Sequence, residues 1–286
     1  MKVIANAKLN LSLDIVGIRE DSYHLLDMVM QSISLSDTLC ISTDNTREIT
    51  IESDSFAVPL DERNLVYKAA TAIMDHCNIK NKGVKIFLNK IIPTEAGLGG
   101  GSADAAATLL ALRKLLKLRL DDEELCSIGL SIGADVPFCL HGGTARVSGI
   151  GEKIKPLSHL TGCCFVVAMP EEGISTANAF SLIDQKTIYT RPSTEELIEA
   201  LESNNIEKAA SLFKNVFQTS GVVTSSDTLI EKIFSFGALS TSLTGTGSAV
   251  FGTFTKETDA INCITQLENS YRCLLAYPVN SGVLFI

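Results

Sequence analysis

The sequence predicts a protein of the α+β class. Segments with helical patterns and segments with strand patterns follow one another along the 286 residues without the strict βαβ alternation of a doubly wound sheet. Hydrophobic residues make up 45% of the chain and charged residues 20%, which leaves ample apolar material for a core. A polar stretch with a proline between Lys155 and His159 suggests a boundary, so we expect two domains, over residues 1–157 and 158–286.

The N-terminal segment has the pattern of a half-buried strand. Apolar and polar side chains alternate over residues 2–16. A period of two is typical of a strand that presents one face to a core and keeps the other face polar. Lys8, Asn10 and Ser12 are therefore expected to project from the same polar face.

The rest of the first half contains further strands, helices and loops. We expect a turn or loop at 17–24, strand structure at 25–43, a helix at 64–78, a strand at 83–91, a helix at 102–118, and strand, turn and strand over 138–154. Asp121 with Glu124 three residues later has the capping-box pattern of a helix start, and Gly133 is expected to end that helix. Pro137 disfavours helical geometry at Val136, so the segment before the first of the two strands is expected to be a loop.

The second half is expected to combine strands with a larger number of helices. We expect a strand at 163–170, helices at 176–184, 194–203, 206–217 and 226–236, two strands about a glycine turn over 240–254, a helix at 256–270 and a late strand at 272–280.

Composition argues against several classes of protein. The net charge of −9 argues against broad nucleic-acid binding, which needs clustered Lys and Arg, but it leaves room for one local basic site for a phosphorylated ligand. The eight cysteines include no C-x-x-C pair, so we expect free, buried thiols in a reducing cytosol. Polar residues interrupt the N-terminus, and no stretch reaches the length of a membrane span. We therefore expect a cytoplasmic protein with no membrane partner.

A cluster of glycines directly precedes the helix expected at 102–118. Gly97, Gly99, Gly100 and Gly101 let the backbone approach a ligand closely and point several N–H groups the same way. A helix that begins at once adds its free first-turn N–H groups and the positive end of its dipole. Together these features indicate an anion site, usually for phosphate. The alternative is a flexible glycine turn that merely starts a helix, since neither G-x-x-x-x-G-K-[ST] nor G-x-G-x-x-G is present.

The residues around this cluster resemble a known family. The pattern P-x-x-x-G-L-G-G-G-S-x-D-A-A is similar to the ATP-binding motif of the GHMP kinases, a superfamily of small-molecule kinases. Three further segments resemble the branch that acts on 4-diphosphocytidyl-2-C-methyl-D-erythritol: "AKLNLSLDIVGIREDSYHLLDMVMQSISLSDTL", "GADVPFCLHGGTARVSGIGE" and, as the third GHMP motif, "LTGTGSAVFGTF". The match covers most of the chain in order, and only residues 160–240 match loosely.

The resemblance implies a fold and an activity. The fold would be the two-domain GHMP kinase fold, with an N-terminal domain like domain 2 of ribosomal protein S5 and a C-terminal ferredoxin-like α/β sandwich. The activity would be transfer of the γ-phosphate of ATP to the 2-hydroxyl of the methylerythritol unit, a step of non-mevalonate isoprenoid precursor biosynthesis. Mg²⁺ is expected with the ATP.

Two residues would carry the chemistry. The resemblance implies that Lys8 and Asp135 flank the acceptor hydroxyl. The chemistry of these two residue types suits the implied roles. A carboxylate on a loop can accept the hydroxyl proton, and a lysine can hold that carboxylate ionised and stabilise developing charge. The ordinary alternatives are that Lys8 lies on a solvated strand face and that Asp135 is a turn residue before Pro137.

The resemblance also assigns binding residues. Those expected at ATP are Pro93, Thr94, Glu95, Ala96, Gly97, Leu98, Gly99, Gly100, Gly101, Ser102 and Ala103, with Asn64 and Leu65 near the adenine, and those expected at the acceptor substrate are Asn10, Tyr23, His24, Phe180 and Thr246. Ser102 is a candidate hydroxyl on the magnesium side. The turn 245–247 should pack by the phosphate loop, or else be a plain hairpin turn.

Tyr23 and His24 would hold the cytosine by stacking and hydrogen bonding, which suits an aromatic face and an imidazole. They stand in "DSYH", where Ser22 replaces the glycine usual in the family, so the resemblance does not fix the backbone path of this loop. Phe180 would lie on the other side of the base, or else be a core residue of a short helix.

Two other functions remain to be weighed. The first is a GHMP kinase for another small alcohol, of mevalonate or homoserine type, against which "DSYH" speaks because such substrates carry no pyrimidine. The second is a non-catalytic nucleotide-binding protein that kept the glycine loop. The presence of both Lys8 and Asp135 argues against it.

Overall fold

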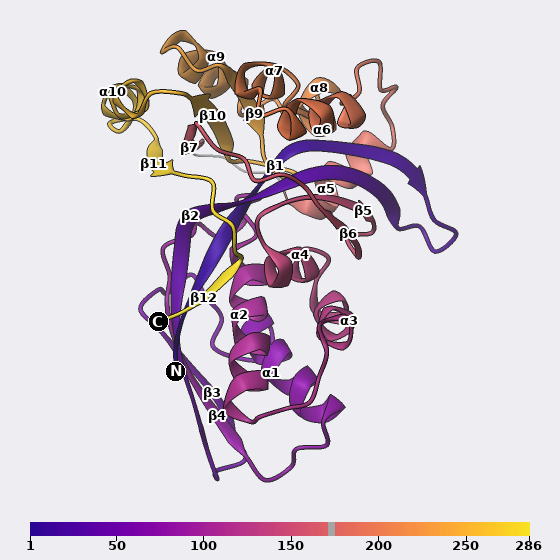
Figure 1. Ribbon diagram of the computed structural model, residues 1–286, viewed down its shortest axis with the longest axis vertical. Helices are drawn as coiled ribbons and strands as arrows, with labels where there is room; N and C mark the ends of the chain where they lie inside the picture. The colour runs from indigo at the N-terminus through magenta and orange to yellow at the C-terminus, as the bar shows by residue number, and fades with distance from the viewer. Residues whose placement is uncertain (171–174) are drawn as a thin grey trace.

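Two β-sheets organise the protein, whose computed structural model describes residues 1–170 and 175–286 (Figure 1). The larger sheet contains β1 (Lys2–Ile18), β2 (His24–Asp44), β3 (Ile49–Ser53), β4 (Gly83–Asn89), β5 (Thr144–Gly149), β6 (Lys153–Pro156), β8 (Lys214–Asn215) and β12 (Val283–Phe285). The smaller sheet contains β7 (Cys164–Met169), β9 (Ser240–Leu243), β10 (Val250–Phe254) and β11 (Arg272–Ala276). The predicted α+β class is confirmed.

The order of strands places β1 and β2 at the centre of the larger sheet. The main path of that sheet is β12-β1-β2-β4-β3, with β5 beside β2, β6 beside β5 and β8 beside β1. The order in the smaller sheet is β11-β7-β10-β9. The two long strands β1 and β2 form an antiparallel hairpin that runs from the lower part of the molecule past the upper helices to a projecting tip (Figure 1).

The helices fall into two groups. The first comprises α1 (Leu65–His76), α2 (Gly100–Leu115), α3 (Asp122–Ile132) and α4 (Val136–His141), which pack beside the larger sheet in the lower half of Figure 1. The second comprises α5 (Thr176–Ile183), α6 (Thr194–Glu202), α7 (Ile206–Ser211), α8 (Val216–Thr219), α9 (Asp227–Ser235) and α10 (Glu257–Leu267), in the upper half with the smaller sheet. None of the helices described is long and apolar enough to cross a membrane.

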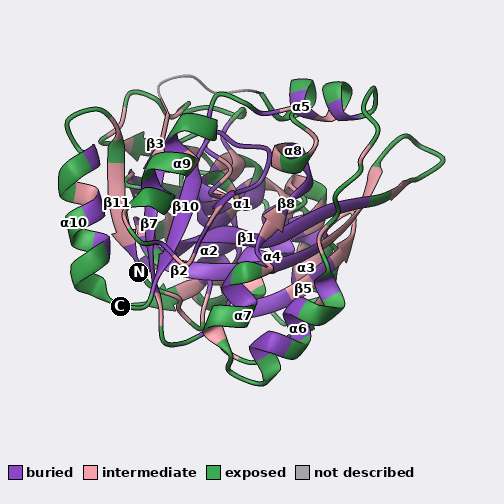
Figure 2. Ribbon diagram, turned by 90° about the horizontal axis from the view of Figure 1, so that it is seen from above, coloured by how far each residue is buried: buried purple, intermediate pink, exposed green. Residues whose placement is uncertain are grey.

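Both faces of β1 are buried from Ala5 to Ile15, and not only the apolar one (Figure 2). Leu9 and Leu11 belong to a core cluster that they share with Phe165 and Phe251 of the smaller sheet. The opposite face, which carries Lys8, is buried as well. The alternation predicted the strand correctly. The alternative that Lys8 lies on a solvated face is wrong, because loops from both halves of the chain cover this face.

The segment at 134–141 also differs from expectation. A helix, α4, stands where a loop and then a strand were expected. Asp135 is its N-cap, and Pro137 falls in the first turn, where the missing N–H leaves no helical hydrogen bond unmade. The Val136 amide donates to the Gly133 carbonyl at 3.1 Å. The restriction on a residue before proline is a preference, and this helix start overrides it.

Several boundaries were also wrong. The expected turn at 17–24 is shorter, because β1 continues to Ile18 and β2 begins at His24. The helix expected at 102–118 is α2, two residues earlier at its start and three at its end. The helix expected at 206–217 is broken into α7, β8 and α8, because residues 214–215 pair with β1. The short strands β3 and β12 were not foreseen.

Other expectations agree with the structure. Asp121 and Glu124 form the capping box of α3, and Gly133 is its C-cap. All eight cysteines are free, but only Cys139, Cys164 and Cys263 are fully buried. The boundary at 157 stays a prediction, and the larger sheet draws β8 and β12 from beyond it.

Candidate active site

The phosphate loop, defined here as residues 93–103, leads into the first turn of α2. Gly99 is the N-cap, with φ at 69° in the left-handed region, and no side chain caps the helix. The first N–H groups of an α-helix have no partners within it. The amides of residues 100–102 are therefore available to an anion, and the helix dipole favours negative charge at the same place.

Lys8 passes directly beside Gly99. A Cβ at Gly99 would lie 2.9 Å from Lys8 Cγ and 3.1 Å from Lys8 Cε, which is closer than packed carbon atoms approach. The Lys8 amide donates to the Leu98 carbonyl at 2.9 Å. Strand β1 and the phosphate loop are thus joined by the main chain, and glycine at position 99 leaves room for the lysine side chain.

The Lys8 ammonium group lies between a carboxylate and a carboxamide. Its Nζ is 3.4 Å from Asp135 Oδ2 and donates to Asn10 Oδ1 at 2.7 Å. The Lys8 side chain is 4% exposed and that of Asp135 is 32% exposed. The lysine is therefore held inside the protein, where charges interact strongly, while the carboxylate stays accessible to a ligand.

The turn between β9 and β10 packs against the phosphate loop. A Cβ at Gly97 would lie 2.2 Å from the Thr244 carbonyl oxygen, and a Cβ at Gly245 would lie 3.0 Å from Gly97 Cα. The Thr244 hydroxyl donates to the Gly97 carbonyl at 3.2 Å, and the Gly245 amide donates to Asn10 Oδ1 at 2.9 Å. The predicted contact between this turn and the phosphate loop is confirmed. Asn10 also links the turn to Lys8.

Two cavities meet at Gly97, Ser102 and Thr176. The first, of about 420 Å³, is lined by Asn64, Leu65 and the phosphate loop. All residues predicted to bind ATP line it except Ala103, which is buried in the core. The second cavity, of about 580 Å³, is lined by the predicted catalytic and substrate residues, namely Lys8, Asn10, Tyr23, His24, Asp135, Phe180 and Thr246.

The far end of the second cavity is aromatic. Tyr23, in the turn of the β1–β2 hairpin, is 60% exposed and has the Arg19 guanidinium 5.5 Å from its ring centre. The rings of His24 and Phe180 lie 4.6 Å apart, centre to centre. Phe180 contacts Phe217 edge to face at 5.0 Å. Phe180 therefore packs against the core and also lines the cavity, so its two expected roles, core residue and cavity residue, are compatible.

Ser22 adopts the left-handed conformation with φ at 71°. This conformation disfavours a side chain by roughly 1–2 kcal/mol, whereas glycine adopts it freely. We expect Ser22→Gly to stabilise the protein slightly, raising Tm by on the order of 1–2 °C in differential scanning calorimetry. The KM for the acceptor substrate should stay within about twofold of wild type. A larger rise in KM would mean that the serine hydroxyl itself contributes to the site.

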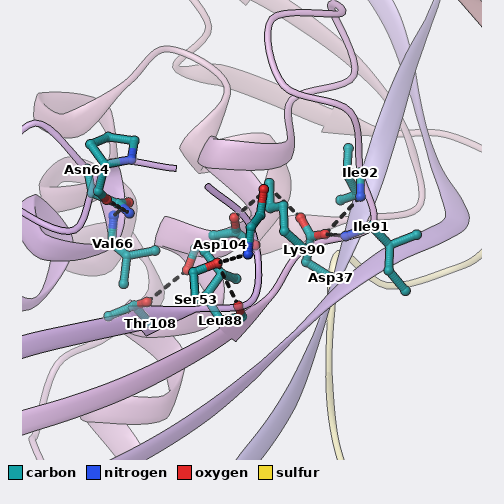
Figure 3. A network of polar contacts seen from close by, with 12 residues as sticks. Asp37, Ser53, Asn64, Val66, Leu88, Lys90, Ile91, Ile92, Asp104 and Thr108 are labelled. Atoms are coloured by element: carbon teal, nitrogen blue, oxygen red, sulfur yellow. Dashed lines mark hydrogen bonds and ion pairs between the residues drawn. The ribbon is translucent and has the colours of Figure 1, made fainter. Parts of the chain in front are cut away.

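A buried ion cluster lies beneath the phosphate loop (Figure 3). Lys90 Nζ donates to Asp104 Oδ2 at 2.8 Å and also to Asp37, and all three side chains are nearly inaccessible. Asp37 Oδ1 in turn accepts from the amides of Ile91 and Ile92 at 2.6 and 2.8 Å. The cluster thereby ties the first turns of α2 to β2 and to the segment that follows β4.

Burial raises the pKa of the Asp104 carboxyl to about 7, although Lys90 acts in the opposite direction. The folded protein therefore keeps a proton that the unfolded chain releases near its ordinary pKa of about 4. The contribution of Asp104 to stability is thus expected to fall as the pH rises from about 4 to about 7, and then to level off. Asp104→Asn cannot ionise and keeps an oxygen for Lys90, so it should lose this pH dependence.

Urea unfolding at a series of pH values checks this expectation. The free energy of unfolding of Asp104→Asn minus that of wild type should increase as the pH rises from about 5 to about 8, by on the order of 1–3 kcal/mol. Asp37→Asn in the same cluster is the matched control. It should destabilise the protein throughout, because its amide nitrogen would face Lys90 or a backbone N–H. Parallel pH curves for wild type and Asp104→Asn would contradict the expectation.

Sequence reasoning missed the role of four residues near the site. Lys90 and Asp37 carried no signal, since their meeting depends on strand pairing across about fifty residues. Asp104 stood in the motif quoted above but received no role. Asp184, whose Oδ1 lies 2.7 Å from His24 Nε2, could not be found from a sequence separation of 160 residues.

Comparison with known proteins gives consistent matches over most of the chain. The model for the GHMP kinases N terminal domain matches residues 64–143, and that for GHMP kinases C terminal matches residues 197–273. The 4-diphosphocytidyl-2-C-methyl-D-erythritol kinase of Clostridium novyi is 45% identical over 271 residues, which cover 93% of this chain and 95% of that protein. The kinase of the same name from Clostridium tetani is 42% identical over 273 residues, covering 95% and 97%.

Solved structures give the same result for the fold. A crystal structure of 4-(cytidine 5'-diphospho)-2C-methyl-D-erythritol kinase has a TM-score of 0.80 at 29% identity and covers 96% of this chain and 98% of its own. The homoserine kinase of Cytophaga hutchinsonii has a TM-score of 0.79 at 18% identity, covering 100% and 97%. At that identity the second match reports the fold alone.

Proposed function

The chain belongs to the GHMP kinases and, within them, to the 4-diphosphocytidyl-2-C-methyl-D-erythritol kinases, and from this premise we propose how its own residues carry out the reaction. It is an ATP-dependent small-molecule kinase that phosphorylates 4-diphosphocytidyl-2-C-methyl-D-erythritol in the non-mevalonate route to isoprenoid precursors. The observation that carries the assignment of residues is the Lys8–Asp135 pair, which lines one of two cavities that meet at the phosphate loop.

Phosphoryl transfer depends mainly on positioning and charge stabilisation. The accessible Asp135 carboxylate accepts the proton of the substrate 2-hydroxyl. The oxygen of that hydroxyl attacks the γ-phosphorus, and the bond from this phosphorus to the bridging oxygen of ADP breaks. Lys8, held by Asn10, stabilises negative charge on the transferred phosphoryl group. The main-chain amides at the start of α2 bind the phosphates of ATP.

Mg²⁺ fits the oxygen groups of this site. Among the residues described, no cluster of three His, Cys, Asp or Glu residues could hold a metal. Mg²⁺ commonly binds through substrate phosphates, water and only one or two protein oxygens. The Ser102 hydroxyl, which lines both cavities, is the group that would hold it together with ATP. When bound, the ion neutralises phosphate charge.

The aromatic end of the second cavity binds the cytosine in this proposal. Tyr23 and Phe180 offer ring faces for stacking, and His24 offers a hydrogen bond to the polar edge of the base. Mevalonate and homoserine have no part that would use these three side chains. The cavity therefore favours the cytidine substrate over the other alcohols.

A coupled assay of ADP release tests the proposed function. The purified protein should release ADP rapidly with 4-diphosphocytidyl-2-C-methyl-D-erythritol and at least about a hundredfold more slowly with mevalonate or homoserine, because a site built for polar groups rejects substrates that lack them. Preference for mevalonate or homoserine would overturn the substrate assignment. Nucleotide binding without ADP release for any alcohol would support the non-catalytic alternative.

Tyr23→Ala tests the cytosine site. Stacking of a base on an aromatic side chain contributes on the order of 1–3 kcal/mol, so KM for the cytidine substrate should rise roughly tenfold or more while KM for ATP changes little. Tyr189→Ala is a matched control, because Tyr189 is 91% exposed and lines neither cavity. Equal increases in both KM values for Tyr23→Ala would indicate a disturbed loop instead of a lost stacking partner.

A further inference from the structure

The His24 imidazole is held from one side by two residues of a single helix. Phe180 and Asp184 lie four residues apart at the C-terminal end of α5, so both can reach the same neighbour. Phe180 contacts the imidazole face, and Asp184 Oδ1 lies 2.7 Å from His24 Nε2. These contacts join β2 to α5 across 160 residues of sequence.

The carboxylate determines which nitrogen of a neutral imidazole carries the proton. An ionised carboxylate only accepts hydrogen bonds, so Nε2 must be the donor in a bond to Asp184. A neutral ring with a proton on Nε2 has an acceptor at Nδ1. No described residue forms a hydrogen bond with Nδ1. That nitrogen therefore remains available as an acceptor in a side chain that lines the second cavity.

We propose that Asp184 is a positioning residue for substrate recognition: it fixes the orientation and the Nε2–H tautomer of His24, and thereby favours a base that presents an amino group to His24 over one that presents a carbonyl oxygen. This inference rests on the proposed function, since it takes the base of the substrate to lie at His24. Cytosine carries an amino group at the position where uracil carries an oxygen. An acceptor nitrogen attracts the first group and repels the second.

The contact with Phe180 makes the effect specific to the imidazole. Phe180 is itself braced by Phe217 at 5.0 Å, so the stacking surface does not depend on Asp184. The Asp184 side chain is 45% exposed and is the C-cap residue of α5. Loss of its charge should therefore change the state of His24 while leaving the helix and its aromatic contacts in place.

Asp184→Asn is the test variant, because it has the same size but carries an amide that can donate to Nε2 as well as accept from it. We expect KM for 4-diphosphocytidyl-2-C-methyl-D-erythritol to rise roughly tenfold, as for loss of a hydrogen bond to a charged group. The preference for this substrate over its uridine counterpart should fall by a similar factor. KM for ATP and kcat should stay within about twofold. Asp184→Glu, which restores a carboxylate, should recover part of the loss.

The tautomer can be observed directly. The chain has four histidines, so ¹⁵N-histidine labelling gives few imidazole signals, and His24→Gln assigns those of His24. Spectra at a pH of about 8.5, where an ordinary imidazole is neutral, should show the Nε2–H form in wild type and a mixture in Asp184→Asn. Gln185→Ala, which changes the neighbouring residue and its bond to Ser181, is the matched control and should leave the spectrum unchanged.

The outcomes separate this inference from the proposed function. A wild-type enzyme that does not use the cytidine substrate overturns the proposed function, whatever Asp184→Asn does. An active wild type with the Nδ1–H form, or an Asp184→Asn variant with unchanged KM and tautomer, overturns the role of Asp184 alone. Equal losses in kcat and in both KM values, without recovery in Asp184→Glu, would also overturn it, because they would show a purely structural contribution.

Discussion

Replacing Asp135 by asparagine is expected to lower kcat by at least about a hundredfold, because general-base catalysis typically contributes about 10²–10⁴-fold. The asparagine keeps the shape of the side chain but cannot accept the hydroxyl proton. KM for the cytidine substrate should change little, since the amide still fills its place in the second cavity. Steady-state kinetics on folded protein is the measurement. A variant that retains more than about a tenth of wild-type kcat would show that Asp135 only positions the substrate.

Lys8→Ala extends this experiment to the other member of the pair. It should also lower kcat. The double variant with Asp135→Asn should lose less than the product of the two single effects, because Lys8 Nζ and Asp135 Oδ2 are only 3.4 Å apart and residues in contact have coupled effects. Lys2→Ala is the matched control, since Lys2 lies exposed on the same strand. Fully independent effects of the two substitutions would argue against a functional pair.

Gly99→Val is expected to lower kcat/KM for ATP by at least about a hundredfold, comparable to the loss of one preorganised oxyanion donor. Position 99 has a left-handed φ, and its Cβ would collide with the Lys8 side chain. The substitution should therefore displace the Lys8 side chain and the first-turn amides together. Kinetics with ATP varied, combined with calorimetric titration of the nucleotide, measures both consequences.

Gly101→Ala is the matched control for this experiment. Its Cβ would make only an ordinary contact of 3.4 Å with Leu65, and its φ lies outside the left-handed region. We expect its kcat/KM for ATP to stay within about fivefold of wild type. Equal losses in both variants would mean that the loop tolerates no side chain at all. Unchanged activity in Gly99→Val would show that ATP binding does not require the backbone conformation that the loop has at residue 99.

Local signals predicted the elements that depend on neighbouring residues. The capping box at Asp121 and the alternation along β1 are both set within a few residues, and both were correct. The failures required information from further away. The sequence around Asn215 predicts a helix, but Asn215 belongs to β8, which pairs with β1. Its side chain donates to the Leu243 and Gly245 carbonyls. No local pattern could reveal these bonds.

The same distinction holds for the candidate site. Family motifs located the phosphate loop, Lys8 and Asp135, because each lies in a short characteristic segment. Motifs did not reveal that Lys8 is buried, because its cover comes from Asn10, Gly99 and the turn at Gly245. They also did not reveal the contact between His24 and Asp184, which joins two elements far apart in the sequence. Charge balance inside the protein is a property of the assembled fold and not of any one segment.

The pairing of β1 with β8 and β12 has a consequence for synthesis on the ribosome. Strand β1 emerges long before its neighbours on one side, which are residues 214–215 and 283–285. During most of translation that edge is open, and an open edge can pair with other chains. The high sequence separation of these pairings also favours slow folding. A ribosome-bound nascent chain should therefore depend on chaperones until residues 283–285 have left the exit tunnel.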